Sequence, residues 1–238
     1  EAGTRMLVGA AQTAGTIGGG HLELKAIEQA RAMLATLGEA GGVAPQTAHY
    51  PLGPALGQCC GGVVDLRLAP LDDEALAAWP EVPPRFHLQL YGAGHVGRAI
   101  VRALEPFDVV VEWIDERDEE FPPPPTQPSV ADIRRVCVDA VESEVVLAPA
   151  GAYYLVLTHR HDLDLRITEA VLERGDFGFL GLIGSATKKA RFLHHFERRG
   201  IPAATVARMT CPIGIEGLPG KEPEVIAVAA VAQLLRVA

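Results

Sequence analysis

The clearest chemical signal in the chain is the glycine-rich segment Tyr91 to Gly97, YGAGHVG, which contains the pattern G-x-G-x-x-G. A run of strand-forming residues, 86–91, leads into this segment, and a helical pattern follows it. A second strand-like run, 109–114, ends on Asp115. A strand, a glycine turn, a helix and a second strand with an acidic end are the parts of a Rossmann β-α-β unit. The segment therefore predicts the fold, whereas the binding of a dinucleotide is a separate question.

Each glycine of the pattern has an expected role. Gly92 permits a tight turn, Gly94 lets the backbone approach a phosphate, and Gly97 lets the helix pack closely on the strand. The free N–H groups at the start of that helix favour an anion. The residues that we assign to this candidate ligand site are Gly92, Gly94, His95, Val96, Gly97 and Asp115.

A second polar segment, Thr158-His159-Arg160-His161-Asp162-Leu163-Asp164, follows an apolar run. It superficially resembles the H-x-H-x-D-H zinc signature of the metallo-β-lactamase fold. However, Leu163 stands where that signature has Asp, and Asp164 where it has His. Positioning or acid–base work by His159 or Asp164 is the better hypothesis, with Thr158 among the ligand contacts. Capping of a strand end is the structural alternative.

A third segment, Gly184 to Arg191, reads GSATKKAR. Ser185 is a candidate helix N-cap, and Lys188 and Arg191 are three residues apart, which predicts one helical face. Two cations beside free N–H groups suit a phosphate. The alternative is an ordinary cap followed by a solvated basic face.

The chain has four cysteines, and their spacing does not suggest a disulfide framework, which favours a reducing cytoplasm. Cys59 and Cys60 lie in a glycine-rich loop, where a thiolate can contact a soft metal such as molybdenum or accept and pass on sulfur. A small core thiol is the alternative. Cys211 lies in a tight turn before proline, and Cys137, in an apolar strand, is predicted to be a core residue.

Composition excludes several classes of protein. The chain has 238 residues, 48% of them hydrophobic, and a formal charge of −9. Nonspecific nucleic-acid binding is therefore not expected. No apolar run reaches membrane-spanning length, and the start lacks the profile of a signal peptide. The first residue is Glu1 rather than methionine, so we expect an upstream piece to be missing.

The pattern of elements predicts an α/β protein with two domains. Residues 1–70 read as a small α+β domain, with a strand at 63–68 and glycine-rich turns at 13–20 and 53–62. Residues 71–84, rich in proline and acidic side chains, read as a linker. From 85 to 238, strands alternate with helices, which predicts a Rossmann-like doubly wound parallel sheet. The last helix, 222–237, is apolar enough for either the core or a homodimer interface.

Six segments together resemble one family. They are TAGTIGGGHLE (13–23), QCCGG (58–62), YGAGHVG (91–97), LTHRHDLD (157–164), GLIGSATKKARF (181–192) and CPIG (211–214). In this order they are similar to the xanthine dehydrogenase accessory family, XdhC/CoxI-like. The resemblance covers nearly the whole chain. It departs from the family pattern before Arg5, where an expected first strand and its loop are absent or not included in this sequence, and in the glycine run 214–220.

The resemblance implies a cytoplasmic maturation factor for molybdenum hydroxylases, with an N-terminal accessory domain and a Rossmann-like domain. Such proteins are thought to bind the molybdenum cofactor (molybdopterin or its cytosine dinucleotide form), protect it during sulfuration and deliver it. The implied partners are the apo-subunit of a molybdenum hydroxylase and a cysteine desulfurase-like sulfur donor.

The chemistry of that cofactor fits the candidate residues. Its phosphate or pyrophosphate suits Gly92 to Gly97, and also Ser185 with Lys188 and Arg191. A thiolate from Cys59 or Cys60 suits molybdenum. We hypothesise that a cleft between the domains brings the thiol loop toward the glycine turn.

Other functions use the same residues differently. In an NAD-dependent oxidoreductase, Asp115 would bind a ribose, with NAD favoured over NADP, and His159 would be the acid–base group. The N-terminal domain offers no evident substrate pocket for that reaction, so NAD(P) is not the favoured ligand. A nucleotidyl transferase acting on the pterin would require magnesium and CTP or GTP. A metallohydrolase is the least favoured.

Overall fold

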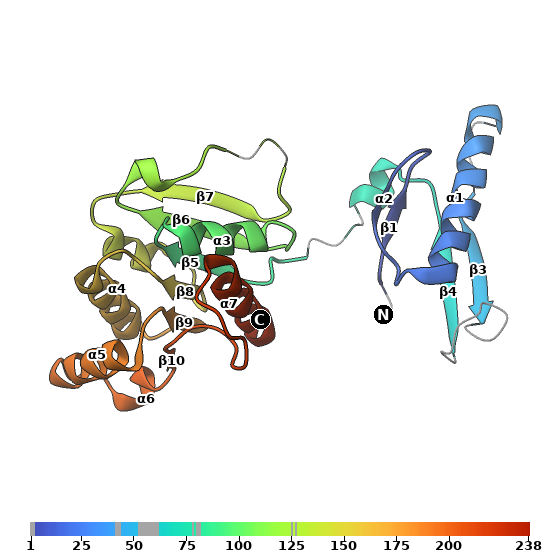
Figure 1. Cartoon of the computed structure of the whole chain (residues 1–238). Helices are drawn as coiled ribbons and strands as arrows, with labels where there is room; N and C mark the ends of the chain where they lie inside the picture. Colours follow the sequence, from blue (N-terminus) through green and yellow to red (C-terminus); the bar gives the residue numbers. More distant parts are fainter. Residues whose placement is uncertain are drawn as a thin grey trace. The chain divides into compact units, whose positions relative to one another are not determined.

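The computed structural model describes residues 3–40, 44–51, 62–77, 79, 82–124, 126 and 128–238. The chain divides into two compact units, Glu1–Glu81 and Val82–Ala238, and Figure 1 labels most of their helices and strands. No helix in the described part of the chain is both long and apolar enough to cross a membrane.

The N-terminal unit is a small α+β arrangement. Its elements are β1 (Met6–Val8), β2 (Thr13–Gly15), α1 (Gly20–Ala40), β3 (Gln46–Pro51), β4 (Val63–Leu68) and α2 (Asp73–Ala77). β1 pairs with β2 and β3 pairs with β4, both antiparallel. The expected strand at 63–68 is confirmed. The turn expected at 13–20 is wrong for its first three residues, because they pair with β1 as β2. The turn expected at 53–62 lies outside the described residues except for Gly62.

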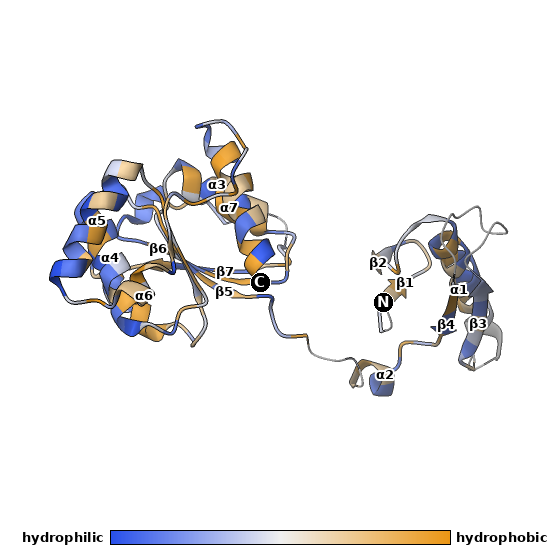
Figure 2. Cartoon of the chain, turned by 90° about the horizontal axis from the view of Figure 1, so that it is seen from below, coloured by the Kyte–Doolittle hydropathy of each residue, from blue (hydrophilic) through white to orange (hydrophobic). Residues whose placement is uncertain are grey.

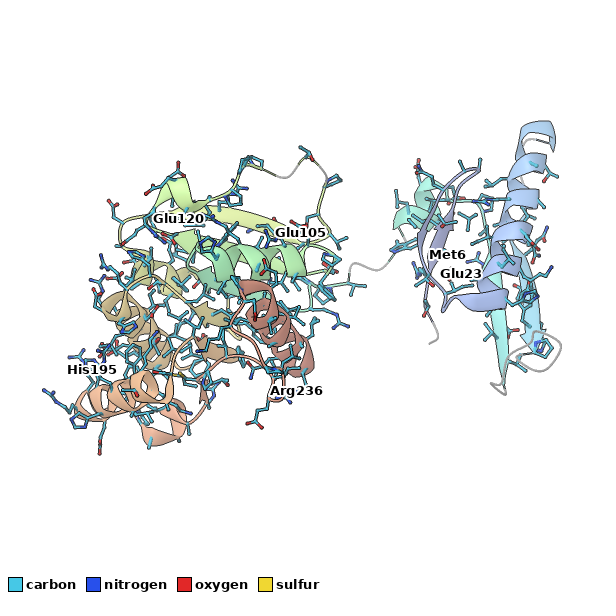
Figure 3. All side chains as sticks on the ribbon, in the orientation of Figure 1. Met6, Glu23, Glu105, Glu120, His195 and Arg236 are labelled. Carbon is cyan, nitrogen blue, oxygen red and sulfur yellow. The ribbon has the colours of Figure 1, made fainter. Side chains whose placement is uncertain are left out.

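The rest of that glycine-rich segment folds around one carboxylate. Oε2 of Glu23, which Figure 3 labels on α1, accepts hydrogen bonds from the hydroxyl of Thr16 and from the backbone N–H groups of Ile17 and Gly19, the latter two at 3.0 Å. These bonds lower the pKa of Glu23, and the bond from Thr16 has the largest effect. Gly18, Gly19 and Gly20 all have positive φ, which a residue with a side chain adopts only at a cost. The N-terminus of α1 therefore carries an anion supplied by its own helix.

The C-terminal unit contains a six-stranded parallel sheet. Its strands are β5 (His87–Tyr91), β6 (Val110–Asp115), β7 (Asp132–Cys137), β8 (Tyr153–Val156), β9 (Phe179–Leu182) and β10 (Met209–Thr210). Their order is β10-β9-β8-β5-β6-β7. The chain builds β5, β6 and β7 outward in one direction and then returns to place β8 on the other side of β5. The order therefore reverses between β5 and β8, which is where doubly wound sheets bind ligands.

Helices connect these strands and cover both faces of the sheet. They are α3 (His95–Leu104), α4 (His161–Arg174), α5 (Ala186–Arg198), α6 (Ala203–Val206) and α7 (Pro223–Val237), with 3-10 turns η2 (Asp118–Glu120) and η3 (Val141–Leu147). Figure 2 shows the apolar strands between α4 and α5 on one side and α3 and α7 on the other. The predicted doubly wound α/β fold is confirmed.

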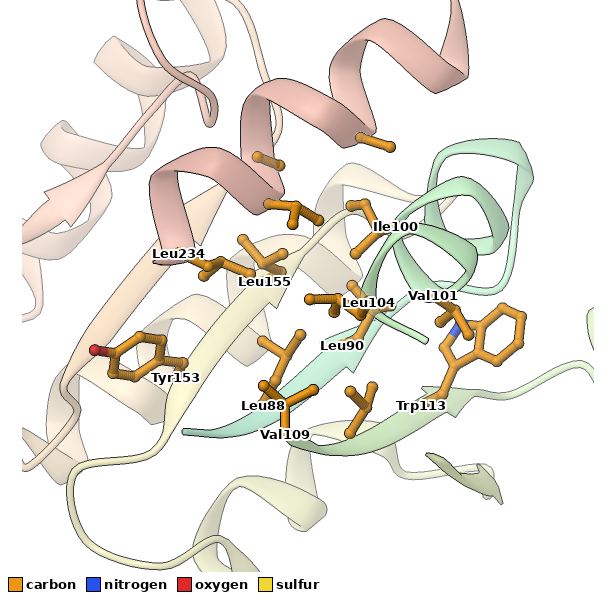
Figure 4. Packing of buried hydrophobic residues seen from close by; sticks show 14 of the residues in the cluster. Leu88, Leu90, Ile100, Val101, Leu104, Val109, Trp113, Tyr153, Leu155 and Leu234 are labelled. Atoms are coloured by element: carbon orange, nitrogen blue, oxygen red, sulfur yellow. The ribbon is translucent and has the colours of Figure 1, made fainter. Parts of the chain in front are cut away.

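Alternation along the strands builds two separate cores. Leu155 of β8 points to the core beneath α3 and α7, shown in Figure 4, whereas Tyr154 and Val156 point to the core beneath α4 and α5. Leu234, on the last helix, is fully buried in the first core. The core interpretation of the last helix is therefore confirmed, and that of a homodimer interface stays a prediction.

Candidate functional site

The loops after β5, β8 and β9 meet at the carboxyl edge of the sheet, as the sequence predicted for the three candidate segments. The N–H of Leu157 donates to Tyr91 O at 2.9 Å, and the N–H of Ile183 donates to Val156 O at 2.9 Å. β8 therefore places Thr158 to Asp164 between the glycine turn and the segment that begins at Gly184.

Two of the glycines are required by close packing, as predicted. Gly92 has a φ of +122°, and a Cβ there would lie 2.5 Å from Leu157 O. A Cβ on Gly97 would overlap the carbonyl oxygen of Gly92. Gly94 differs, because a Cβ there would meet no atom within 4 Å and its φ is −70°. Gly94 is the N-cap of α3 and has no side chain, so no capping side chain accepts a hydrogen bond from the first N–H groups of α3. Open space therefore lies beside the free end of α3.

The glycine turn is held in place by side chains from β6 and the residues around it. The carboxylate of Asp115 accepts from Ala93 N at 2.7 Å, and the indole N–H of Trp113 donates to Gly92 O at 3.1 Å. The guanidinium of Arg98 donates to Ala93 O at 3.0 Å. The conformation of the turn is thus set by the protein before any ligand arrives.

Asp115 has no acceptor site left for a ligand. Its Oδ1 accepts from N and Nε of Arg117, each at 3.0 Å, and its Oδ2 accepts from Ala93 N and from Arg117 Nη2 at 3.0 Å. Four donors fill the lone-pair positions of one carboxylate. Burial opposes ionisation, but the hydrogen bonds outweigh it and the pKa of Asp115 is lowered. The assignment of Asp115 to a ligand stays a prediction, and the structure shows it supporting the turn.

A cavity of about 220 Å³, which we call the β8–β9 pocket, opens where those two strands end. It is lined by Thr158, His159, His161, Asp164, Ile183, Gly184, Ser185 and Lys188. Six of these are residues that the sequence analysis assigned to a site. The parallel sheet therefore brings two of the three candidate segments into one concave surface.

The pocket contains a buried ion pair. Lys188 Nζ donates to Asp164 Oδ2 and, at 2.7 Å, to Ile183 O. The other oxygen of Asp164 accepts from the N–H and hydroxyl of Thr158, at 2.9 and 2.7 Å. Asp164 is fully buried and Lys188 is 8% exposed. The positive charge of Lys188 is therefore neutralised, and Asp164 is held as a partner rather than presented as a free acid or base.

Ser185 is the N-cap of α5, as predicted, because its Oγ accepts from Lys188 N at 3.3 Å. Lys188 and Arg191 do not share a face toward one ligand. Lys188 turns inward to Asp164, whereas Arg191 is exposed and lines a different cavity. The phosphate site expected from these two cations together is therefore not formed.

His159 lies at the rim of the pocket, where its side chain is 36% exposed. Its Nε2 is 3.5 Å from Glu116 Oε1, and Arg160 Nη1 is 3.4 Å from the same oxygen. Glu116 follows β6 and His159 follows β8, so these contacts span the end of β5, which lies between them. The structure thus places His159 at the carboxyl edge of the sheet, on the rim of the β8–β9 pocket and across the end of β5 from Glu116.

A larger cavity of about 540 Å³, the α4–α5 groove, lies between those two helices. It is lined by His161, Asp162, Leu165, Arg191, Phe192, His194, His195 and Arg198. His161 lines both the groove and the β8–β9 pocket. The sequence analysis missed this groove, although the run of cations and histidines in 188–199 was a visible signal.

The structure gives different outcomes for the predictions made about the four cysteines. Cys59 and Cys60 lie outside the described residues. The prediction of a core position for Cys137 is wrong, because β7 is an edge strand of the sheet and leaves the side chain exposed. Cys211 is buried in the core, and burial raises the pKa of its thiol. Within the described ranges, no three His, Cys, Asp or Glu side chains gather closely enough to hold a metal ion.

Comparison with known proteins identifies the family. Residues 88–234 match the XdhC Rossmann domain, and residues 1–50 match the XdhC and CoxI family. The chain is 30% identical over 234 residues to the uncharacterized protein YqeB of Escherichia coli K12. The aligned region is 94% of this chain and 38% of that relative. The chain thus spans well under half the length of this curated relative.

A solved structure agrees on the fold. A protein from Bacillus halodurans described as a xanthine dehydrogenase superimposes with a TM-score of 0.70, over 98% of this chain and 85% of that one, at 20% sequence identity. At this identity the likeness shows the fold alone. The Rossmann match, which covers more than half of the chain, shows more: this chain belongs to the XdhC and CoxI family.

Proposed function

We propose that this chain is an accessory protein of a xanthine dehydrogenase-type molybdenum hydroxylase and binds the molybdenum cofactor at the carboxyl edge of its Rossmann sheet. Family membership supports the accessory role. The observation that carries the binding proposal is the β8–β9 pocket, which opens at the same edge of the sheet as the glycine turn, within the matched domain.

The residues present fit a phosphate-bearing ligand. The free N–H groups at the start of α3 face the open space beside Gly94, and a helix N-terminus favours an anion. The turn is held by Asp115, so it would bind without reorganising. A pocket of about 220 Å³ is below the roughly 300–1,000 Å³ of sites for drug-sized ligands. It would therefore hold one end of the cofactor and shield it from water.

When bound, the cofactor supplies the molybdenum centre that the client hydroxylase uses. In this proposal the chain protects that centre during sulfuration in the cytoplasm and delivers it to the apo-subunit. Cys59 or Cys60 would contact molybdenum or accept sulfur from a desulfurase-like donor. Affinity and client activation that are both unchanged after Cys59→Ala and Cys60→Ala would remove the thiols from the proposal.

An NAD-dependent oxidoreductase is less well supported by the geometry. A ribose on Asp115 would have to displace donors that already fill its carboxylate. Breaking charge-assisted hydrogen bonds of this kind costs about 1.5–3 kcal/mol each.

The experiment compares two ligands on the wild type and on Gly94→Ala. A methyl group at Gly94 meets no protein atom, so the fold should be unaffected, but it would occupy space where the ligand approaches the backbone. We expect wild-type protein to bind molybdopterin and the variant to bind about tenfold more weakly, equivalent to about 1.4 kcal/mol. Tight NADH binding with hydride transfer, and no molybdopterin binding, would overturn the proposal.

A further inference from the structure

The α4–α5 groove presents a cationic stripe. Arg191, His194, His195 and Arg198 line it from α5 at positions i, i+3, i+4 and i+7, which is the spacing of one helical face. His161 lines it from the start of α4. In a chain with a formal charge of −9, this local concentration of basic side chains is unusual.

The arginines of the stripe are available to a ligand. Within the described ranges, no carboxylate forms an ion pair with Arg191 or Arg198. The histidines differ, because His195 Nε2 is 3.2 Å from Glu169 Oε2 and His194 Nδ1 is 3.9 Å from Glu197 Oε2.

Nearby acids do not neutralise the arginines. The carboxylate that lines the groove, Asp162, is 3.2 Å from Arg160 Nη2. Glu169 also accepts from Arg199 at 2.5 Å. Two unpaired guanidinium groups on one helical face suit a phosphate.

The two cavities adjoin at His161. The β8–β9 pocket, at about 220 Å³, is too small for a whole nucleotide-bearing ligand, and the groove, at about 540 Å³, lies within the roughly 300–1,000 Å³ of sites for drug-sized ligands. Because His161 lines both cavities, the groove is the neighbouring space for a ligand that has one end in the pocket.

We infer that the α4–α5 groove is a subsite for the nucleoside monophosphate end of a ligand whose other end occupies the β8–β9 pocket, with Arg191 and Arg198 binding its phosphate. This inference rests on the proposed function, and it assigns the dinucleotide form of the cofactor as the preferred ligand. A bare phosphate would leave most of the groove empty.

The test uses cytidine 5′-monophosphate and inorganic phosphate as probes, followed by the two forms of the cofactor. Isothermal titration is carried out on the wild type, on the double variant Arg191→Gln/Arg198→Gln and on Arg236→Gln. Arg236 is an exposed arginine on α7, across the sheet from α5, and Figure 3 labels it together with His195. All three proteins should have the same thermal midpoint.

We expect the double variant to bind cytidine 5′-monophosphate and the dinucleotide cofactor at least tenfold more weakly. The mononucleotide cofactor should change less than twofold, and Arg236→Gln should match the wild type. Equal affinity of all three proteins for cytidine 5′-monophosphate would overturn the subsite. Equal affinity of the wild type for inorganic phosphate and cytidine 5′-monophosphate would overturn the nucleoside assignment.

Failure of the proposed function has a different signature. If neither form of the cofactor binds the wild type, cofactor binding fails and the link between the two cavities is overturned with it. An equal loss of both forms in the double variant would instead show that the groove holds the phosphate they share, and would overturn the preference for the dinucleotide.

Discussion

Two helices, α3 and α5, begin at the same edge of the sheet, and their N-termini are satisfied in opposite ways. α5 is capped by Ser185, and Lys188 in its first turn is buried against Asp164. α3 begins at Gly94, has no side-chain cap and leaves open space beside its first N–H groups. The segment with more charge is thus closed by internal partners, whereas the uncharged glycine turn stays open to a ligand.

The largest expected effect of a substitution is at the glycine turn. Gly97→Ala places a methyl group where the carbonyl oxygen of Gly92 lies, and neither backbone can move without displacing α3 from β5. We expect a loss of about 4–5 kcal/mol, the extreme for a single substitution, measured by urea unfolding. Gly94→Ala is the matched control and should change stability by about 1 kcal/mol or less, because glycine is a better N-cap than alanine but a methyl group there meets no atom. Similar values for the two variants would refute the difference between these glycines.

The next effect is at the buried pair of the pocket. Lys188→Met leaves the carboxylate of Asp164 buried without its cation, and we expect a loss of about 3–4 kcal/mol at pH 7. Adding Asp164→Asn should restore part of that loss, because the uncompensated charge is removed. Asp164→Asn is also measured alone. If it destabilises the wild type and Lys188→Met by the same amount, the two side chains are not coupled.

Asp115→Asn tests the support of the glycine turn. The variant loses charge-assisted hydrogen bonds to Arg117 and Ala93, and we expect a loss of about 2 kcal/mol at pH 7.

The pH dependence of this effect has a definite sign. Because the folded pKa of Asp115 is lowered, its contribution is complete above the unfolded pKa of about 3.9 and is lost as the pH falls through the folded value. The stability difference between wild type and variant should therefore shrink below about pH 4. A constant difference from pH 7 to pH 2.5 in urea unfolding would contradict this assignment.

The smallest expected effect is at the cap of α5. Ser185→Ala removes one acceptor from a 3.3 Å hydrogen bond, and we expect a loss of about 0.5–1 kcal/mol. Ser185→Asp, which keeps a capping acceptor, should recover most of it in the same unfolding assay. If alanine and aspartate behave alike, the cap contributes nothing.

The sequence predicted the sheet and the packing roles of Gly92 and Gly97 because these depend on local pattern. It did not predict that Lys188 pairs with Asp164, 24 residues away, or that Asp115 accepts from Ala93, 22 residues away, because only the folded sheet brings these residues together. The exposure of Cys137 could not be inferred either, because the position of β7 at the edge is a property of strand order.

Short elements were also beyond the sequence patterns. β10 has two residues and α6 has four, which is too few for a period to be visible. The α4–α5 groove was missed because the cations of 188–199 do not all lie on the surface. Lys188 is buried and Arg191 is exposed, and the sequence alone does not show which cation is which.

In the N-terminal unit, the carboxylate of Glu23 occupies the backbone N–H groups that a free anion would otherwise bind. Its carboxylate is joined to the helix whose end it fills, so its effective concentration there is in the millimolar range or higher, and its lowered pKa keeps it charged. A free phosphate or nucleotide would have to outcompete a group that never diffuses away. The glycine-rich turn of this unit is therefore closed by a carboxylate of the chain itself, whereas the turn at Gly92 to Gly97 is not.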